Sequence, residues 1–165
     1  MKLRPYDNEK DFENIKNWVT DERTHAMWSA NRFVYPLDKD NFGEFLSFEE
    51  EKYGNKAFLA LENGKAVGFF CYTLNNLTKE GLFKFIVVNP EHRGKGIAVE
   101  MLRLAREYAF NETKADAVQL MVFTDNIRAK KCYEKAGFVE RSTTEDAFTY
   151  KDESWGRCNM VYRRN

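Results

Sequence analysis

Hydrophobic residues recur at helical spacing through the first third of the chain, after a short run at Lys2–Arg4 that predicts a strand. Three stretches carry apolar side chains three or four residues apart, and a residue able to cap or start a helix precedes each. These stretches begin at Asp7 or Asn8, at Asp21 and after Pro36, and the last ends at Gly54. Their buried faces would carry Phe12, Ile15, Trp18 and Val19, then Met27 and Trp28, then Phe42, Phe45 and Leu46.

The spacing changes to that of strands in the middle of the chain. Ala57–Glu62 and Ala66–Thr73 are apolar runs on either side of Asn63-Gly64, a dipeptide that adopts positive φ at little cost and closes a hairpin. Leu82–Val88 is apolar on both faces except at Lys84, which is typical of a strand covered on both sides.

Helical spacing returns over Gly96–Asn111 and again over Asn126–Ala136. Between these two helices, Val118–Phe123 predicts another strand that is apolar on both faces. Phe138–Thr144 and Arg157–Tyr162 predict a closing pair of strands. No repeat or linker interrupts the chain, so we expect the order β-α-α-α-β-β-β-α-β-α-β-β.

Length and composition predict a single domain over residues 1–165, because 165 residues bury one good core and are few for two. Lysine plus arginine balances aspartate plus glutamate at 26 each, so we expect neither a nucleic-acid nor a membrane partner. The start lacks a signal-like apolar stretch, and the three cysteines have no metal-like spacing. These features predict a cytoplasmic protein with reduced thiols and no metal site.

The segment Val87–Ala98 joins a buried strand to a helix through a loop with two glycines and two cations. Free backbone N–H groups and the positive end of the helix dipole would meet there, which favours a phosphate or pyrophosphate. Gly94 and Gly96 would let a ligand approach the backbone, although a tight turn is the alternative for this loop alone. No Ser or Thr follows Lys95, which excludes a Walker loop, and Val99 stands where a dinucleotide fingerprint needs its third glycine.

A second constellation lies on the helix predicted for Asn126–Ala136. Asn126, Ala129 and Tyr133 are spaced to share one helical face. A small residue between an amide and a phenol would suit a linear ligand that passes across this face. Taken alone, the pattern also fits a helix cap followed by ordinary core.

Together, these constellations resemble the GNAT superfamily of N-acetyltransferases. Arg93-x-x-Gly96-x-Ala98 matches the family's pyrophosphate signature, Q/R-x-x-G-x-G/A, and Asn126-x-x-Ala129-x-x-x-Tyr133 matches its second motif. The spacing between the motifs accommodates one helix and one strand, as in the family. The segment Phe148–Met160 looks most like the branch that holds ribosomal-protein and spermidine acetyltransferases.

The resemblance implies an α/β fold with a mixed, mostly antiparallel sheet, a splayed central parallel strand pair and helices on both faces. It implies acetyl-CoA as the acetyl donor, with the pantetheine arm paired to the backbone of Ile86, Val87 and Val88. Asn126 would hydrogen-bond the donor near this arm, and an unpaired N–H group after Val88 could stabilise an oxyanion. The pyrophosphate would be held, mainly through main-chain N–H groups, by Arg93, Gly94, Lys95, Gly96, Ile97 and Ala98.

Acetyl transfer to an amine needs two proton transfers. The amine must lose a proton before it attacks, and the departing thiolate must gain one. The resemblance gives the second task to Tyr133, since a tyrosine hydroxyl has an ordinary pKa of about 10. Counting back from Arg93 puts Glu80 where histone-type members carry a glutamate base, and a solvated turn residue is the alternative for Glu80.

The sequence therefore predicts an enzyme that transfers an acetyl group from acetyl-CoA to a primary amine of a small molecule or peptide, by direct attack in a ternary complex. A non-catalytic CoA-binding or sensing module on the same fold is the alternative. Acidic residues that could meet a cationic acceptor such as a polyamine are Asp21, Glu22, Glu145 and Asp146. The sequence leaves open the acceptor, the general base, the preferred acyl group and whether the protein is a homodimer.

Overall fold

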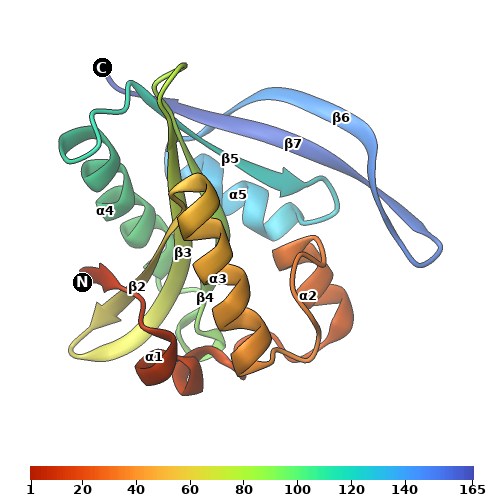
Figure 1. Cartoon of the computed structure of the whole chain (residues 1–165). Coiled ribbons are helices and arrows are strands. Elements are labelled where there is room, and N and C mark those ends of the chain that lie inside the picture. Colours follow the sequence, from red (N-terminus) through yellow and green to blue (C-terminus); the bar gives the residue numbers. More distant parts are fainter.

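One mixed sheet runs through the computed structural model, which describes residues 1–165 (Figure 1). Its strands are β1 (Lys2–Pro5), β2 (Lys56–Glu62), β3 (Lys65–Asn75), β4 (Glu80–Val88), β5 (Ala117–Phe123), β6 (Val139–Tyr150) and β7 (Glu153–Arg163). The helices are α1 (Asn8–Ile15), α2 (Glu22–Ser29), α3 (Lys39–Tyr53), α4 (Ile97–Asn111) and α5 (Ile127–Lys135), with a 3₁₀ turn at Pro90–His92. The strands lie in the order β1-β2-β3-β4-β5-β7-β6, and the element order predicted from the sequence is confirmed.

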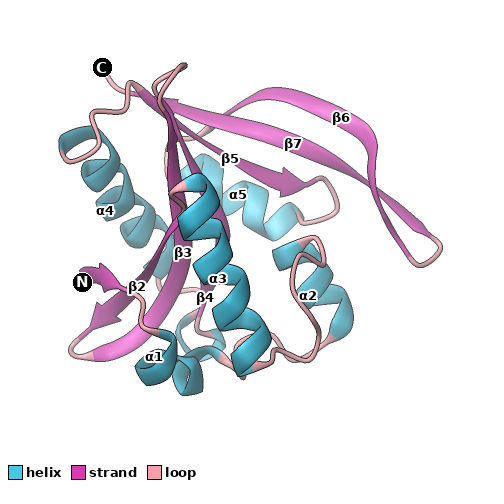
Figure 2. Cartoon of the chain, in the orientation of Figure 1, coloured by secondary structure: helices cyan, strands magenta, loops and turns pink.

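Helices cover both faces of the sheet (Figure 2). On one face, Met101, Leu102 and Ala105 of α4 pack into a buried cluster that also includes Tyr133 of α5. On the other face, the N-terminal helices pack against the sheet through residues such as Phe42. The predicted fold class is confirmed, since every neighbouring pair of strands is antiparallel except β4 and β5.

The parallel pair β4–β5 is joined over only part of its length. Glu80–Phe83 pairs with Ala117–Leu120, and beyond these residues the two strands diverge. A bulge accompanies the divergence, because the register of β3 against β4 shifts at Phe69–Cys71 and Phe85 adopts a φ of +53°. Bulges bend a strand and increase its twist, so the second half of β4 turns away from β5. The predicted splay is thus confirmed.

Two boundary predictions were wrong. Helix α1 ends at Ile15, so Trp18 and Val19 leave the helix, although both stay buried in the core. Strands β6 and β7 extend well beyond the predicted Phe138–Thr144 and Arg157–Tyr162, and their hairpin projects past the rest of the sheet in Figure 1. Most of β6 is exposed on both faces, so its sequence lacks the apolar alternation that identifies a strand.

Side-chain caps fix the starts of four helices. Asp7, Asp21, Asp38 and Asn126 accept hydrogen bonds from the first-turn N–H groups of α1, α2, α3 and α5. Helix α4 differs, because its N-cap is Gly96 and no side chain caps it. None of the five helices is long and apolar enough to cross a membrane.

Candidate active site

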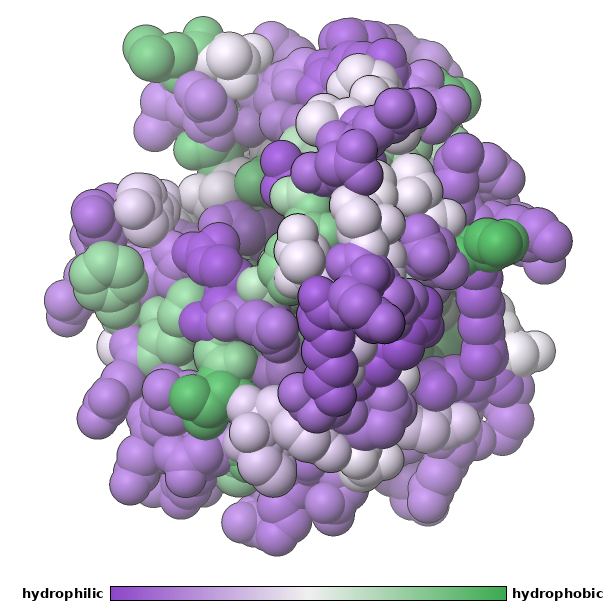
Figure 3. All heavy atoms as spheres, turned by 90° about the vertical axis from the view of Figure 1, so that its right-hand side faces the viewer, coloured by the Kyte–Doolittle hydropathy of each residue, from purple (hydrophilic) through white to green (hydrophobic).

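A cavity of about 920 Å³ opens where β4 and β5 diverge, between α2 on one side and α5 on the other. Figure 3 views the molecule from the right-hand side of Figure 1, where hydrophilic side chains dominate and hydrophobic ones show between them. The predicted site residues that line this cavity are Ile86, Val87, Val88, Arg93, Gly94, Gly96, Ile97, Ala98, Asn126 and Tyr133. The structure therefore brings together two motifs that lie some thirty residues apart in the sequence.

The glycine loop forms an open backbone surface at one end of the cavity. Gly94 and Gly96 have φ angles of +77° and +74°, which favour glycine, and a Cβ built on either would meet no atom within 4 Å. Because α4 has no side-chain cap, its first-turn N–H groups stay free for an external acceptor. Free N–H groups, a helix dipole and open space are the features that a pyrophosphate requires, so the loop fits the phosphates of CoA.

Two guanidinium groups line the same end of the cavity. Burial, and next to it the nearby charge of Arg128, lowers the pKa of Arg93. Like charges held close together repel unless an anion lies between or beside them. Arg128 also lies in the first turn of α5, where the helix dipole disfavours a cation. Both facts fit a site that holds phosphate.

The divergent half of β4 offers unpaired backbone to the cavity. Beyond Phe83 no residue of β4 pairs with β5, while Val87 and Val88 still pair with β3 on the other side. The β5-facing N–H and C=O groups of this segment need partners when they leave water. A pantetheine arm contains two amides, and it can pair with such an edge as an added strand would.

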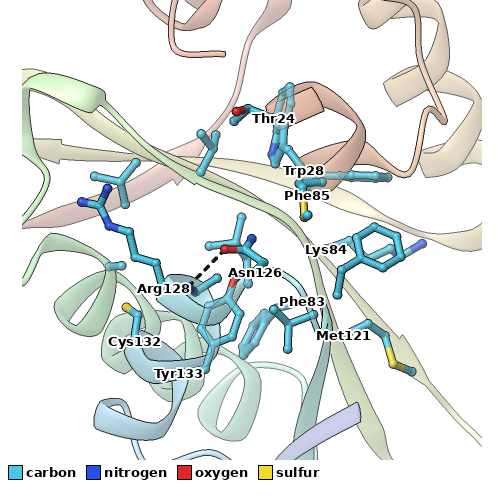
Figure 4. A pocket seen from close by; sticks show the side chains of 18 of the residues that line it. Thr24, Trp28, Phe83, Lys84, Phe85, Met121, Asn126, Arg128, Cys132 and Tyr133 are labelled. Atoms are coloured by element: carbon cyan, nitrogen blue, oxygen red, sulfur yellow. Dashed lines mark hydrogen bonds between the residues drawn. The ribbon is translucent and has the colours of Figure 1, made fainter. Parts of the chain in front are cut away.

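Tyr133 points from α5 into the middle of the cavity (Figure 4). The residue is 8% exposed, and burial raises the pKa of its hydroxyl well above the ordinary value. Asn126 caps the same helix, with its Oδ1 accepting from the Ala129 N–H at 3.3 Å. The predicted shared face of Asn126, Ala129 and Tyr133 therefore lines the cavity.

Two predicted site residues lie outside this cavity. Lys95 lines a small neighbouring hollow with Lys65 and His92. Glu80 begins β4 at its closed end and forms a bidentate ion pair with Arg141, at 2.7 and 3.1 Å. Hydrogen bonds from Arg141 lower the pKa of Glu80, which makes its carboxylate a weak base at neutral pH. The structure does not bring Glu80 to the cavity, because Glu80 lies in the half of β4 that is paired with β5, where Arg141, 61 residues away in the sequence, binds its carboxylate.

Sequence reasoning missed several cations of the cavity: Arg32, Lys84, Arg128, Lys131 and Arg157. For Arg128 a signal was present, because a cation in the first turn of a helix opposes the helix dipole and calls for an anionic partner. For Lys84 the signal was its place as the one charged residue in the otherwise apolar run Leu82–Val88, whereas for Arg157 no local signal exists. No three His, Cys, Asp or Glu side chains are arranged to hold a metal ion.

A sheet opened between two parallel strands, with a glycine-rich helix entrance beside the opening, defines a class of CoA-dependent acyltransferases. The chain belongs to the acetyltransferase (GNAT) family, whose sequence profile matches residues 12–138. The resemblance inferred from the two motifs is confirmed. As a member of this family the chain is an acetyl-CoA-dependent N-acetyltransferase.

Known relatives act on different amines. Spermidine N(1)-acetyltransferase of Escherichia coli K12 is 32% identical over 140 residues, which cover 84% of this chain and 72% of the relative. Aminoglycoside N(6')-acetyltransferase type 1 of Klebsiella pneumoniae is 23% identical over 147 residues, covering 82% and 72%. The structure of Vibrio cholerae spermidine N-acetyltransferase with CoA and spermine superimposes with a TM-score of 0.82 at 23% identity, covering 98% of this chain and 94% of that one. That likeness confirms the fold.

Proposed function

We propose that this chain acetylates a primary amine of a small molecule or peptide by direct attack within a ternary complex, with Tyr133 as the proton donor. The observation that carries the proposal is the position of Tyr133 in the middle of the cavity, between the glycine loop and a second group of lining residues. Acetyl-CoA supplies the acetyl group, activated as a thioester. A non-catalytic sensing module would need neither a proton donor in the cavity nor open space beside it for an amine.

Residues of the loop and of α5 bind and orient the donor. Main-chain N–H groups at Gly94, Gly96 and the first turn of α4 hold phosphate, and Arg93 and Arg128 neutralise its charge. The free edge of β4 after Phe83 holds the pantetheine amides. An N–H group of this edge would also stabilise the developing oxyanion.

The chemical step forms a bond from the amine nitrogen to the acetyl carbon and breaks the carbon–sulfur bond. Tyr133 donates its proton to the departing thiolate. Burial raises the pKa of Tyr133, so the hydroxyl is protonated across the physiological range, and burial disfavours the thiolate as it disfavours the phenolate. Water takes the proton of the attacking amine, because the cavity lining contains no Asp or Glu and its histidine, His92, lies beside the glycine loop at the phosphate end.

Release of free thiol from acetyl-CoA in the presence of a panel of amines, amino acids and short peptides tests the proposal. We expect amine-dependent release, with a product heavier by one acetyl group in the mass spectrum. Reactions without amine measure background hydrolysis. Acetyl-CoA binding without transfer to any amine would instead indicate the sensing module.

We further propose that the reaction takes place in the cytoplasm. All three cysteines, Cys71, Cys132 and Cys158, are free thiols, which suits a reducing compartment. The single-domain organisation stays a prediction.

A further inference from the structure

The part of the cavity away from the glycine loop contains cations and no carboxylate. We define this acceptor side by six lining residues: Thr24, Met27, Trp28, Lys84, Met121 and Arg157. In Figure 4, Lys84 and Met121 lie across the cavity from Arg128 and Cys132, with Tyr133 between them. Arg93 and Arg128 are the cations at the phosphate end of the cavity. Lys84 and Arg157, on the acceptor side, are therefore not needed for the phosphates and are free to bind the acceptor.

Strand register places the acceptor-side cations on one face of the sheet. Arg157 of β7 lies opposite Phe123 of β5, and residues directly opposite in an antiparallel pair point to the same face. Met121 and Phe123 share that face because side chains alternate along a strand. Lys84 of β4 faces the same side, since its Nζ lies 3.9 Å from Glu49 of α3.

Charge on this side of the cavity is not balanced within the chain. The buried carboxylate of Glu49 contacts Arg32 at 2.9 Å and Lys84 at 3.9 Å, and both cations line the cavity. One negative charge is therefore shared between two positive charges. Arg157 is exposed and has no ion pair within the chain. The indole N–H of Trp28 is buried without a partner, and an indole can only donate. Together these groups form a set of hydrogen-bond donors with excess positive charge.

The acidic residues that could have met a polycation lie elsewhere. Asp21 caps α2 through the Thr24 N–H at 2.8 Å, and Glu22 pairs with Lys151 at 3.4 Å. Asp146 accepts from Ser154 at 2.7 Å, and neither it nor Glu145 lines the cavity. No carboxylate lines the cavity to receive the positive charges of a polyamine or aminoglycoside, since Glu49, whose Oε2 is buried without a partner, lies behind Arg32 and Lys84 and already pairs with both.

We propose, on the basis of the acetyltransferase function above, that the acceptor carries an anionic group close to its amine. The anion is a carboxylate or a phosphate, bound by Lys84 and Arg157 with the Trp28 N–H as a further donor. Met27 and Met121 give the same space an apolar surface, which suits an acceptor with an apolar side chain beside the anion. The acceptor class thus differs from the polycations acted on by the named relatives.

Matched pairs of amines test this proposal by thiol release from acetyl-CoA. Phenylalanine and 2-phenylethylamine differ by one carboxylate, and O-phosphoethanolamine and ethanolamine differ by one phosphate. A charge-assisted hydrogen bond to a buried partner changes affinity by about tenfold or more. We expect kcat/KM to be at least about tenfold higher for the anionic member of one pair, and the pair that responds identifies the source of the anion.

Variants assign the effect to the acceptor side. Arg157→Gln should lower kcat/KM for the anionic amine by up to about fivefold, the effect of an ion pair at an exposed position, and should leave kcat/KM for the matched amine without the anion, and the KM for acetyl-CoA, unchanged. Arg157→Glu should reverse the preference. Arg163→Gln removes the same charge from an exposed position of the same strand outside the cavity, and it should behave like the wild type. Because Arg157 is exposed, these changes do not threaten folding.

Two results would overturn the proposal and separate it from the proposed function. The first is faster acetylation of spermidine or 2-phenylethylamine than of every anionic amine, with no loss of kcat/KM in Arg157→Gln. This result would show that the acceptor is not anionic, while the acetyltransferase function would stand. No amine-dependent thiol release with any of these acceptors would count against the transfer reaction itself, and the anionic acceptor would fall with it.

Discussion

Tyr133 has its ring in the hydrophobic core and its hydroxyl in the cavity. The core contacts hold the ring in place, so the hydroxyl does not have to be ordered when a substrate arrives. Since burial raises its pKa above the ordinary value of about 10, the hydroxyl is protonated, and so able to donate, at physiological pH.

Tyr133→Phe keeps the ring and removes the donor. We expect kcat to fall by about 10²-fold, because the proton is needed chiefly as the thiolate departs. Stability and the KM for acetyl-CoA should barely change. Tyr150→Phe, at another buried tyrosine outside the cavity, is the control. Unchanged turnover in folded Tyr133→Phe, with chemistry rate-limiting, would make solvent the proton source.

Single residues could be predicted from the sequence where local spacing defines a face. Asn126 and Tyr133 are seven residues apart on one helix, so their alignment follows from helical geometry. The ion pair between Glu80 and Arg141 joins residues 61 apart in the sequence, and the residues next to Glu80 do not predict it. Glu80 was therefore inferred as a base from its position in the sequence alone. Only the folded structure shows that Arg141 is its ion-pair partner.

Among the elements, the junction of β4 and α4 depends most on its glycines. Gly96→Asp puts a carboxylate where phosphate is expected, and acetyl-CoA affinity should fall below detection by calorimetry. Gly54→Asp is the matched control, since Gly54 also has positive φ (+70°) and open space around it but caps α3 away from the cavity. Equal losses of affinity in both variants would point to backbone strain and not to the site.

The ion pair between Arg4 of β1 and Asp11 of α1 fastens the first helix to the edge of the sheet. Two hydrogen bonds of 2.7 Å join the side chains, and Asp11 is buried. Hydrogen bonds from Arg4, and from the Asp7 N–H, lower the pKa of Asp11 although burial opposes them. A carboxyl with a lowered folded-state pKa stabilises the fold above its unfolded pKa, and this stabilisation is lost as pH falls through the folded pKa.

Asp11→Asn should therefore lower the free energy of unfolding by about 1–3 kcal/mol at pH 7. The difference from wild type should begin to shrink below about pH 4, where Asp11 of the unfolded chain takes up a proton, and should vanish only below the lower folded-state pKa. Urea unfolding at pH 7 and pH 3 measures both values. Glu9→Gln, which breaks an exposed pair with Lys39, should lower the free energy of unfolding much less than Asp11→Asn does. A loss in Asp11→Asn that is the same at both pH values would contradict the ionic explanation.

Element types could be predicted because apolar periodicity reports which faces are buried. The outer half of the β6–β7 hairpin could not, since most of β6 faces solvent and the few buried side chains of this outer half, such as Tyr150 and Trp155, pack in a small separate cluster with α2. The bulge in β4 could not be predicted from the sequence either. Phenylalanine prefers a negative φ, and the positive φ at Phe85 is imposed by the surrounding sheet.

For the molecule as a whole, acetyl-CoA should act as a stabiliser. A ligand at a hundredfold excess over its dissociation constant adds about 2.7 kcal/mol. For a chain of 165 residues this corresponds to a rise in Tm of roughly 5–11 °C. NAD and ATP should shift Tm much less, because the loop has neither of their fingerprints. A larger shift with ATP, measured by scanning calorimetry, would place the nucleotide and not the thioester in the cavity.

The open edge of β4 has a consequence for the behaviour of the protein in a crowded solution. An unpaired strand edge normally recruits the strands of other proteins and so promotes aggregation. Here the free edge lies inside a wedge that Glu80–Phe83 closes at one end and that α2 and α5 flank. A strand of another protein would have to enter between these elements before it could pair with the edge. The same geometry that admits the donor therefore keeps the enzyme from becoming a template for misassembly.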